Sequence, residues 1–324
     1  MRLVKNIGIV GTGVIATEFV TQIDTSKYTI HSVYNRNPRS LETFKEAHQL
    51  HHGYTDYNEF LNDDDLDCVY IATPNQTHYD YAKKAIETGK HVLCEKVMVL
   101  KGEQAQELFA LAKKHHVVIL EAVTLFFMPM YHEVSRLLEQ NVLGKISGAN
   151  ITFGSCKEYD VNNRFFSLEK GGGALFDIGP YALSAAVYLL GTDIELVSSE
   201  VVMAPSGVDE KSVTTLKTKN NELASVMLSF RGKLPKQILV TGDEGYLLIN
   251  DFPRATTADI FYNDGTTQVI EVGDGKDVFT YEMDMLNHLA NEKDLEHVPD
   301  CREVSQRVIE LMDAMRREWG WELE

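Results

Sequence analysis

The segment from Asn6 to Ala16 constrains the fold of this chain more than any other. A short apolar run, Ile7 to Val10, is followed by the spacing G-x-G-x-x-A. Gly11 can adopt the positive φ of a tight turn, Gly13 lets a phosphate approach the backbone, and Ala16 permits close packing of a helix on a strand. Although such a motif is weak alone, it predicts a strand, a turn and a helix whose N-terminus binds a pyrophosphate. The expected cofactor contacts are Gly11, Thr12, Gly13, Val14 and Ile15.

A second strand is expected from Tyr28 to Tyr34, and its end lies about twenty residues beyond the glycines, where the ribose is read. A site that prefers NAD carries Asp or Glu there, whereas this chain has Asn35 and Arg36. A guanidinium can hold a 2′-phosphate through paired, charge-assisted hydrogen bonds. The sequence therefore predicts NADP, with NAD still possible, and makes Asn35 and Arg36 expected cofactor contacts. The alternative is that Arg36 is a solvated loop charge.

Further apolar runs at 68–72, 91–94 and 117–120 alternate with helical patterns, which is typical of a doubly wound parallel sheet. Ligands of such sheets bind beyond the carboxyl ends of the strands. We therefore predict an α/β, NAD(P)-binding Rossmann domain over residues 1–121. Its remaining expected cofactor contacts follow the runs at 68–72 and 91–94: Thr73, Pro74, Asn75, His78, Glu95 and Lys96.

Residues 122–324 have a different pattern. A helix at 131–140 precedes a strand at 146–153, and three glycines from Gly171 introduce an apolar helix that ends near Leu190. Alternating runs rich in Thr and Val follow, with turn signals between them, and two helices are expected at 281–290 and 303–319. This half is predicted to be an α+β domain for substrate binding and oligomerisation, with a large, mostly antiparallel open sheet.

The charge balance indicates which partners to expect. The 324 residues include 31 Lys and Arg against 48 Asp and Glu, a formal net charge of −17, which repels nucleic acid and anionic membranes. We expect no signal peptide and no apolar run near the roughly 20 residues of a membrane span. The four cysteines and the histidines lack metal-ligand spacing, and a reducing cytoplasm is the expected location. Cys68 and Cys94 are expected in the core.

Several motifs in order resemble the glucose-fructose oxidoreductase/inositol dehydrogenase/MocA (Gfo/Idh/MocA) family. They are the glycine turn, Thr-Pro-Asn with His78, Gly-Lys-His-Val leading to Glu-Lys, Glu-Ala at 121–122, the triple glycine with Asp-Ile-Gly-x-Tyr, and the segment 305–320. The form of the triple-glycine motif looks most like the dihydrodiol dehydrogenase and NADP-dependent xylose dehydrogenase branch. The resemblance implies hydride transfer between a nicotinamide and a secondary alcohol or ketone of a sugar, polyol or cyclic diol. It also implies a homodimer formed through the open sheet.

The resemblance also implies the roles of individual residues. Lys96 would stand beside the nicotinamide and the substrate hydroxyl, and Tyr181 would be the general acid and base. A phenol titrates near pH 10, so it needs a neighbouring cation to act at neutral pH. Asp177 would orient the substrate or hold Lys96, and Arg164 would contact a polar substrate or only form a salt bridge. His78 would border the nicotinamide ribose or simply pack at a helix start. The expected substrate contacts are Lys96, Phe126, Arg164, Asp177 and Tyr181.

Two positions depart from the family pattern. Val97 replaces the usual proline after Glu-Lys, and Phe126 stands where the branch carries an arginine, which favours a less polar substrate. These changes keep open a second interpretation, a cofactor-binding sensor or regulatory protein without redox turnover. Asp177 and Tyr181 share a helix face if the helix already includes Asp177. If Pro180 begins the helix, Asp177 lies in the preceding turn.

Overall fold

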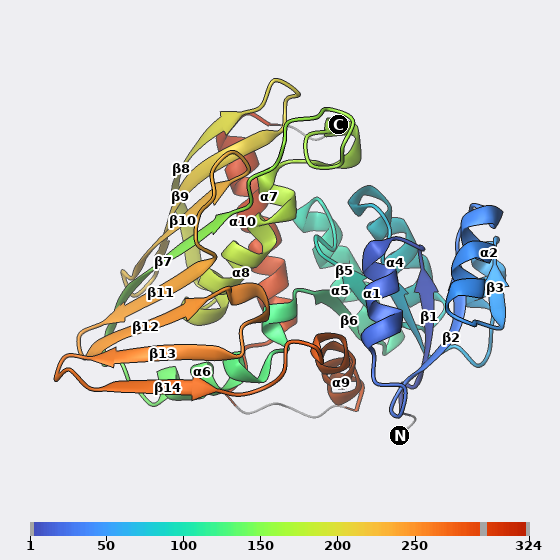
Figure 1. Cartoon of the computed structure of the whole chain (residues 1–324), viewed down its shortest axis with the longest axis horizontal. Helices are drawn as coiled ribbons and strands as arrows, with labels where there is room; N and C mark the ends of the chain where they lie inside the picture. The colour runs from blue at the N-terminus through green and yellow to red at the C-terminus, as the bar shows by residue number, and fades with distance from the viewer. Residues whose placement is uncertain (1–2, 292–296, 322–324) are drawn as a thin grey trace. The chain divides into compact units, whose positions relative to one another are not determined.

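The computed structural model describes residues 3–291 and 297–321, which form two compact units (Figure 1). Unit 1 comprises Met1–Ala122 together with Lys276–Asp294, and unit 2 comprises Val123–Gly275 together with Leu295–Glu324. The predicted boundary lies between residues 121 and 122. In the structure the chain first passes from unit 1 to unit 2 one residue later, between Ala122 and Val123. The segment around 276–294, which we assigned to the second domain, instead belongs to unit 1.

Unit 1 is built on a six-stranded parallel sheet with the order β3-β2-β1-β4-β5-β6. The chain crosses from one half of this sheet to the other between β1 and β4, and such a switch point opens a crevice at the carboxyl ends of the strands. The central strands are apolar and buried on both faces, as the sequence predicts. The strands are β1 (Asn6–Val10), β2 (Thr29–Tyr34), β3 (His52–Tyr54), β4 (Cys68–Ile71), β5 (His91–Glu95) and β6 (Ile119–Ala122).

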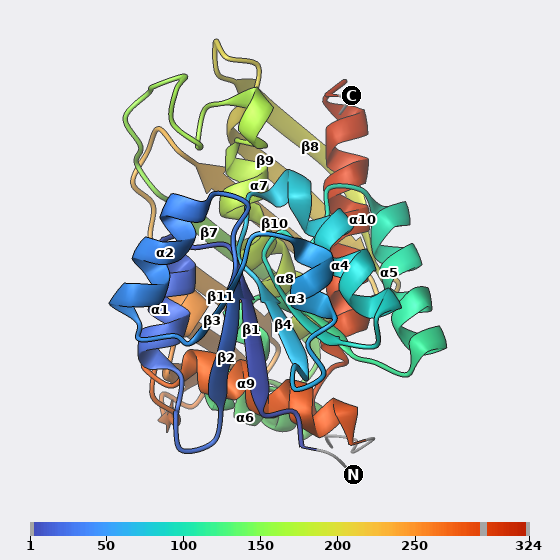
Figure 2. The same ribbon diagram turned by 90° about the vertical axis from the view of Figure 1, so that its right-hand side faces the viewer.

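Helices cover both faces of this sheet. Helix α1 contacts α9, which also contacts β5 and β6. Helix α4 contacts β4 and β5, and its neighbour α5 contacts β6 (Figure 2). Helix α9 joins unit 1 because Phe279 packs edge-on against Phe19 of α1 and Asn287 bonds the backbone of Val4. The helices are α1 (Val14–Gln22), α2 (Pro38–Ala47), α3 (Tyr57–Leu61), η1 (Asn75–Thr77), α4 (His78–Glu87), α5 (Gly102–His115) and α9 (Val278–Ala290).

Unit 2 is built on an eight-stranded sheet with the order β14-β13-β12-β11-β7-β10-β9-β8. Its pairs are antiparallel except for β7 and β10, which run parallel, so the prediction of a mostly antiparallel sheet is confirmed. The strands are β7 (Ile146–Gly154), β8 (Ile194–Met203), β9 (Asp209–Thr218), β10 (Leu223–Ser229), β11 (Gln237–Gly242), β12 (Gly245–Asn250), β13 (Thr257–Tyr262) and β14 (Thr267–Glu271).

One face of this sheet is covered by helices. Helix α8 contacts β7 and β10, α10 contacts β8, and α6 contacts β13 and β14 (Figure 1). The opposite face carries no helix among the described residues. The helices are η2 (Thr124–Phe126), α6 (Pro129–Glu139), η3 (Leu168–Lys170), α7 (Ala174–Asp177), α8 (Gly179–Leu190), η4 (Phe252–Arg254) and α10 (Cys301–Glu318).

The apolar stretch after the triple glycine corrects one expectation. Leu168–Leu190 has the length and hydropathy of a membrane span, although we expected no such run. In the structure it comprises η3, α7 and α8, and 78% of its most apolar window is buried inside the protein. It is apolar because α8 is the core helix of unit 2, packed between the sheet and α10.

Candidate functional site

A cleft of about 340 Å³ opens at the carboxyl ends of β1, β2 and β4 in unit 1. Its lining combines the glycine turn, the loop after β2, the loop after β4 and one side chain of α4. This is the switch point of the sheet, where open α/β folds bind their ligands. The lining residues are Gly11, Thr12, Gly13, Tyr34, Asn35, Arg36, Ala72, Thr73, Pro74, Thr77 and Tyr81.

The two glycines of the turn have different tasks. Gly11 has φ +101°, and a Cβ there would lie 2.5 Å from the carbonyl oxygen of Ala72, so only glycine fits. Gly13 is the N-cap of α1, and a Cβ would meet no protein atom within 4 Å. Its open face lies at the N-terminus of a helix, where anions bind. Ala16 is fully buried, as expected for close packing of the helix.

The loop after β2 is preorganised around Arg36. Asn35 Nδ2 donates a hydrogen bond of 2.7 Å to Thr12 Oγ1, and Asn35 Oδ1 accepts one from the backbone of Asn37. Asn37 in turn caps α2 through the backbone N–H groups of Arg39 and Ser40. The backbone on both sides of the exposed Arg36 is therefore fixed, while its guanidinium remains available at the cleft.

The loop after β4 is held by His78, which the sequence placed at the ribose or at a helix start. The ring is fully buried at the beginning of α4, with Nε2 2.7 Å from the carbonyl oxygen of Thr73 and Nδ1 2.9 Å from that of Val97. Burial lowers the pKa of His78, because it disfavours the charged ring. His78 thus ties two loops together and does not line the cleft. Asn75 also lies outside the cleft lining, in η1.

The Glu-Lys segment lies at the end of β5, whose last residue is Glu95, and is fixed by buried neighbours. Tyr70 donates a hydrogen bond of 2.5 Å to Glu95 Oε1, and the backbone N–H of Lys96 donates to Glu95 Oε2 at 3.3 Å. The Lys96–Val97 peptide bond is cis, and Val97 is fully buried. The next residue, Met98, donates its backbone N–H to Glu121 Oε1. Both sides of Lys96 are therefore anchored. Four of the expected cofactor contacts lie outside the lining of the cleft: Glu95, Lys96, Val14 and Ile15.

In unit 2, the predicted residues Asp177 and Arg164 come together as an ion pair with 3.3 Å between Arg164 Nη2 and Asp177 Oδ1. The Asp177 side chain is 14% exposed and that of Arg164 66%. The Arg164 guanidinium also lies over the ring of Phe165, 4.4 Å from its centroid. The aspartate is thus nearly buried and its partner lies at the surface, so a ligand can reach the arginine directly.

Tyr181 lies one turn beyond Asp177, across a helix break at Ile178. The structure combines the two alternatives left open by the sequence, because Asp177 is helical in α7 while Gly179 and Pro180 begin the separate helix α8. Tyr181 is half-buried, with its ring 6.2 Å from that of Phe153. Phe126, which we expected at the substrate, is 1% exposed and stacks with Tyr188.

The structure adds residues to the cleft that the motifs did not indicate. Tyr34 and Tyr81 both line it, with 3.4 Å between their hydroxyl oxygens, and burial raises the pKa of Tyr34 to about 12. Tyr81 lies on α4, and only the geometry of the sheet brings it beside Tyr34 of β2. Among residues 3–291 and 297–321, no three His, Cys, Asp or Glu side chains converge as a metal site.

Comparison with known proteins agrees with this arrangement. Residues 5–123 match the oxidoreductase family with an NAD-binding Rossmann fold, and residues 131–248 match the GFO/IDH/MocA C-terminal domain. The chain belongs to the Gfo/Idh/MocA oxidoreductase family. Members of this family that the chain resembles include trans-1,2-dihydrobenzene-1,2-diol dehydrogenase of Xenopus laevis, 32% identical over 78% of this chain and 77% of the relative. Another is scyllo-inositol 2-dehydrogenase (NADP(+)) of Bacillus subtilis, 28% identical over 96% of each chain.

Solved structures share the fold of this Gfo/Idh/MocA protein. A 3-ketoreductase from Actinomadura kijaniata, in complex with NADP and TDP-benzene, superposes with a TM-score of 0.84 at 23% identity, covering 97% of each chain. A levoglucosan dehydrogenase in complex with NADH and levoglucosan gives a TM-score of 0.85 at 19% identity, covering 98% of this chain and 97% of that one. The predicted family and fold class are thus confirmed, and the protein is an NAD(P)-dependent oxidoreductase.

The cleft of unit 1 fits such a cofactor. Gly13 leaves room for a pyrophosphate at the start of α1, and Arg36 offers a cation at the end of β2. The family relationship therefore agrees with the chemistry of the residues that line the cleft.

Proposed function

We propose that this protein is an NADP-dependent oxidoreductase that transfers a hydride between the nicotinamide and a secondary alcohol or ketone of a sugar, polyol or cyclic diol. The observation that carries the cofactor preference is the guanidinium of Arg36 at the cleft, with no acidic residue among the described residues that line it. A carboxylate there would repel a 2′-phosphate, whereas a guanidinium binds it through charge-assisted hydrogen bonds. Asn35 and Thr12 support this proposal, because their hydrogen bond fixes the loop.

The bound nicotinamide would accept or donate the hydride. In the oxidation direction, the substrate carbon loses a hydride and its hydroxyl loses a proton. We assign the proton transfer to Tyr181 and the electrostatic support to Lys96, whose ammonium favours the ionised phenol or a developing alkoxide. Asp177 orients the substrate, and its ion pair with Arg164 provides a polar contact for a substrate hydroxyl.

The substrate class is supported by the relatives named above, which act on a cyclic diol and on an inositol. Phe126 stands where the dihydrodiol branch carries an arginine, and this supports a substrate site with one charged donor fewer than in that branch. We therefore expect neutral polyols, cyclic diols or their ketones rather than sugar phosphates.

Replacing Lys96 with Met tests the enzymatic assignment. The change removes the ammonium while keeping the length of the side chain, so turnover should be lost and the dissociation constant of NADPH should change little. Lys84→Met is a matched control, because Lys84 is an exposed lysine on α4 outside the cleft. Unchanged turnover in Lys96→Met would refute the assigned role.

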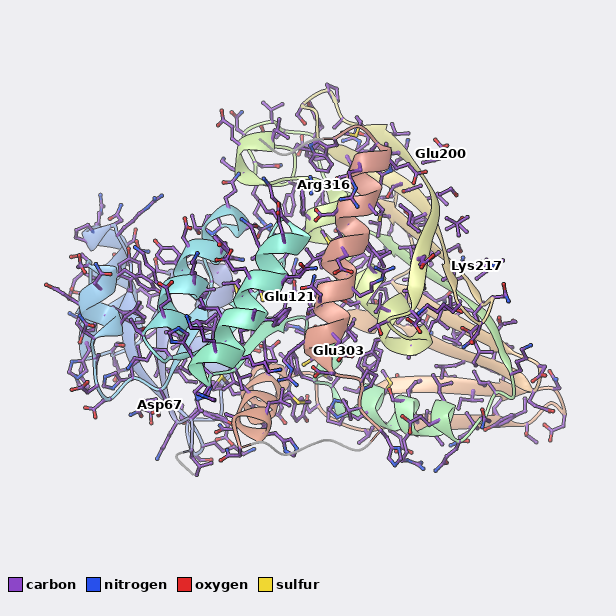
Figure 3. All side chains as sticks on the ribbon, turned by 180° about the vertical axis from the view of Figure 1, so that it is seen from behind. Asp67, Glu121, Glu200, Lys217, Glu303 and Arg316 are labelled. Carbon is purple, nitrogen blue, oxygen red and sulfur yellow. The ribbon has the colours of Figure 1, made fainter. Side chains whose placement is uncertain are left out.

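We also propose a homodimer formed through the open face of the unit 2 sheet. Large apolar side chains are exposed on this face, including Val213 (48%), Met227 (37%), Tyr246 (39%) and Val269 (62%). Val213 and Met227 pair across β9 and β10, and Glu200 and Lys217 lie on the same face, away from α10 (Figure 3). A wide apolar sheet face is typical of an interface between proteins.

The cytoplasm remains the proposed location of this protein.

A further inference from the structure

We propose that Asp209, the first residue of β9, is a positioning residue that holds α7 and thereby Asp177 in the geometry of the substrate site. This inference rests on the proposed function for its kinetic consequence but not for its structural one. No motif marks Asp209, and it lies 32 residues beyond Asp177 in the chain.

The geometry shows what Asp209 contributes. Helix α7 is a single turn, and its N-cap is Gly173, which has no side chain to accept the free backbone N–H groups of the turn. Asp209 Oδ2 accepts the N–H of Leu175 at 2.9 Å, in a bond that is buried on both sides. The carboxyl group of Asp209, which belongs to β9, thus replaces the missing N-cap side chain.

Gly173 and Asp209 are also matched in shape. Gly173 has φ +114°, and a Cβ at this position would lie 2.2 Å from Asp209 Oδ1. The glycine backbone is held from the other side, because its N–H donates to the carbonyl oxygen of Phe165 at 2.9 Å. The absence of a side chain at residue 173 therefore leaves the space that the Asp209 carboxyl group occupies.

The connection from this turn to the site is short. The carbonyl oxygen of Gly173 accepts the backbone N–H of Asp177 at 3.2 Å, which closes the turn of α7. The Asp177 carboxylate then forms its ion pair with Arg164. Within one turn, any displacement of Gly173 or Leu175 moves Asp177 relative to the substrate, and a shift of about 1 Å is costly in catalysis.

Asp209 is an unusual residue for a purely structural contact. It is fully buried, and Oδ1 has no hydrogen-bond partner among the described residues. Burial raises the pKa of Asp209 to about 7. Among the described residues, the charged groups near α7 include the Arg164–Asp177 pair and Arg316 over the ring of Phe176. A buried carboxyl group with a single hydrogen bond costs stability, and the cap that it supplies to α7 is the function that we assign to it.

Hydrogen–deuterium exchange of the purified protein tests the structural part. In Asp209→Ala, backbone amides in the peptide 174–178 should exchange about tenfold faster than in the wild type, the effect of a lost cap. Asp209→Asn keeps an acceptor oxygen and should restore protection to within about twofold. Thr214→Val is the control, because Thr214 is a buried polar residue of the same strand that bonds Ser199 instead of α7. Protection in Asp209→Ala equal to that of the wild type would overturn the proposal.

A second measurement covers the case in which Asp209→Ala does not fold. In wild-type protein labelled with ¹⁵N-leucine, the Leu175 amide resonance should shift with the titration of Asp209, and Asp209→Asn should abolish this shift. A Leu175 resonance that does not respond to pH, or responds equally in Asp209→Asn, would overturn the proposal.

Kinetics separate positioning from mere stability. Asp209→Ala should lower kcat at least tenfold, while the dissociation constant of NADPH, which is bound by unit 1, should stay within about twofold. Asp209→Asn should recover most of kcat. If wild-type protein turns over no substrate while the exchange and resonance results hold, the proposed function fails and the role of Asp209 in holding α7 stands.

Discussion

Asn35 Nδ2 donates a hydrogen bond of 2.7 Å to Thr12 Oγ1, and this bond joins the loop after β2 to the glycine turn after β1. The two loops carry the two features of a dinucleotide site, the open helix N-terminus at Gly13 and the guanidinium of Arg36. Because the bond runs between uncharged side chains, it fixes the loop without adding charge near a 2′-phosphate.

Replacing Arg36 with Ala tests the cofactor preference. We expect the dissociation constant of NADPH to rise about tenfold or more, since a charge-assisted contact is lost, and that of NADH to change less than twofold. Fluorescence titration measures both constants. Arg39→Ala is the matched control, because Arg39 is an exposed arginine on α2 outside the cleft. A parallel loss of NADH and NADPH affinity in Arg36→Ala would argue against contact with the 2′-phosphate.

The two glycines of the turn should respond differently to alanine. Gly11→Ala places a Cβ 2.5 Å from the Ala72 carbonyl oxygen at φ +101°, so it should lower the free energy of unfolding by roughly 1–3 kcal/mol. Gly13→Ala meets no protein atom within 4 Å, and its cost should stay below about 1 kcal/mol. Its Cβ nevertheless stands where a pyrophosphate would approach.

Chemical denaturation and NADPH titration together check this contrast. Gly13→Ala should lose NADPH affinity while remaining stable, and Gly11→Ala should lose both. Full NADPH affinity in Gly13→Ala would mean that the pyrophosphate does not approach the backbone at this turn.

Asp209 predicts a dependence of stability on pH. Burial raises the pKa of Asp209 from 3.8 to about 7, so between these values the folded protein holds a proton that the unfolded chain releases. The contribution of Asp209 to the free energy of unfolding should therefore fall as pH rises from 4 to 8. Asp209→Asn lacks this titration, and its stability relative to the wild type should rise over the same interval, by at most about 4 kcal/mol at about 1.4 kcal/mol per pKa unit.

Urea denaturation at several pH values measures the difference. Asp264→Asn serves as a control, because Asp264 is an exposed turn residue bonded to Thr266 and its pKa is lowered. A constant stability difference between the wild type and Asp209→Asn from pH 4 to 8 would contradict the shifted pKa.

The open sheet face predicts the effect of charge on assembly. Val213→Lys places an ammonium among exposed apolar side chains, and it should convert a dimer to a monomer at micromolar concentration in sedimentation experiments. Leu3→Lys is the control, since Leu3 is 70% exposed but belongs to unit 1. A wild type that sediments only as a monomer would count against the proposed homodimer.

Local motifs and periodicity were sufficient to predict the two-part architecture, the glycine turn and the buried strands with Cys68 and Cys94 at 0% exposure. They were insufficient where structure depends on distant segments. Helix α9 returns to unit 1 because Phe279 contacts Phe19, a pairing that spans most of the chain. Tyr81 reaches the cleft because β4 lies beside β1, and no local pattern encodes that neighbour.

The candidate site has the same limits. Gly11 and Arg36, which line the cleft, could be predicted as candidates because their spacing has a chemical meaning. Asp209 begins a strand with ordinary alternation, and its contact with Leu175 depends on how β9 packs against α7. His78 is marked by a motif, but its bonds to Thr73 and Val97 show that it holds loops, which the spacing alone did not distinguish from ribose contact.

Nicotinamide absorbance over time is the most direct test of the account. Wild-type protein is incubated with NADP and, separately, with NAD, against aldoses, inositols, cyclic diols and the corresponding ketones. We predict turnover with at least one neutral polyol, diol or ketone, and a higher kcat/KM with NADP than with NAD. Tight NADPH binding without turnover of any of these compounds would contradict the enzymatic account and favour a cofactor-binding sensor.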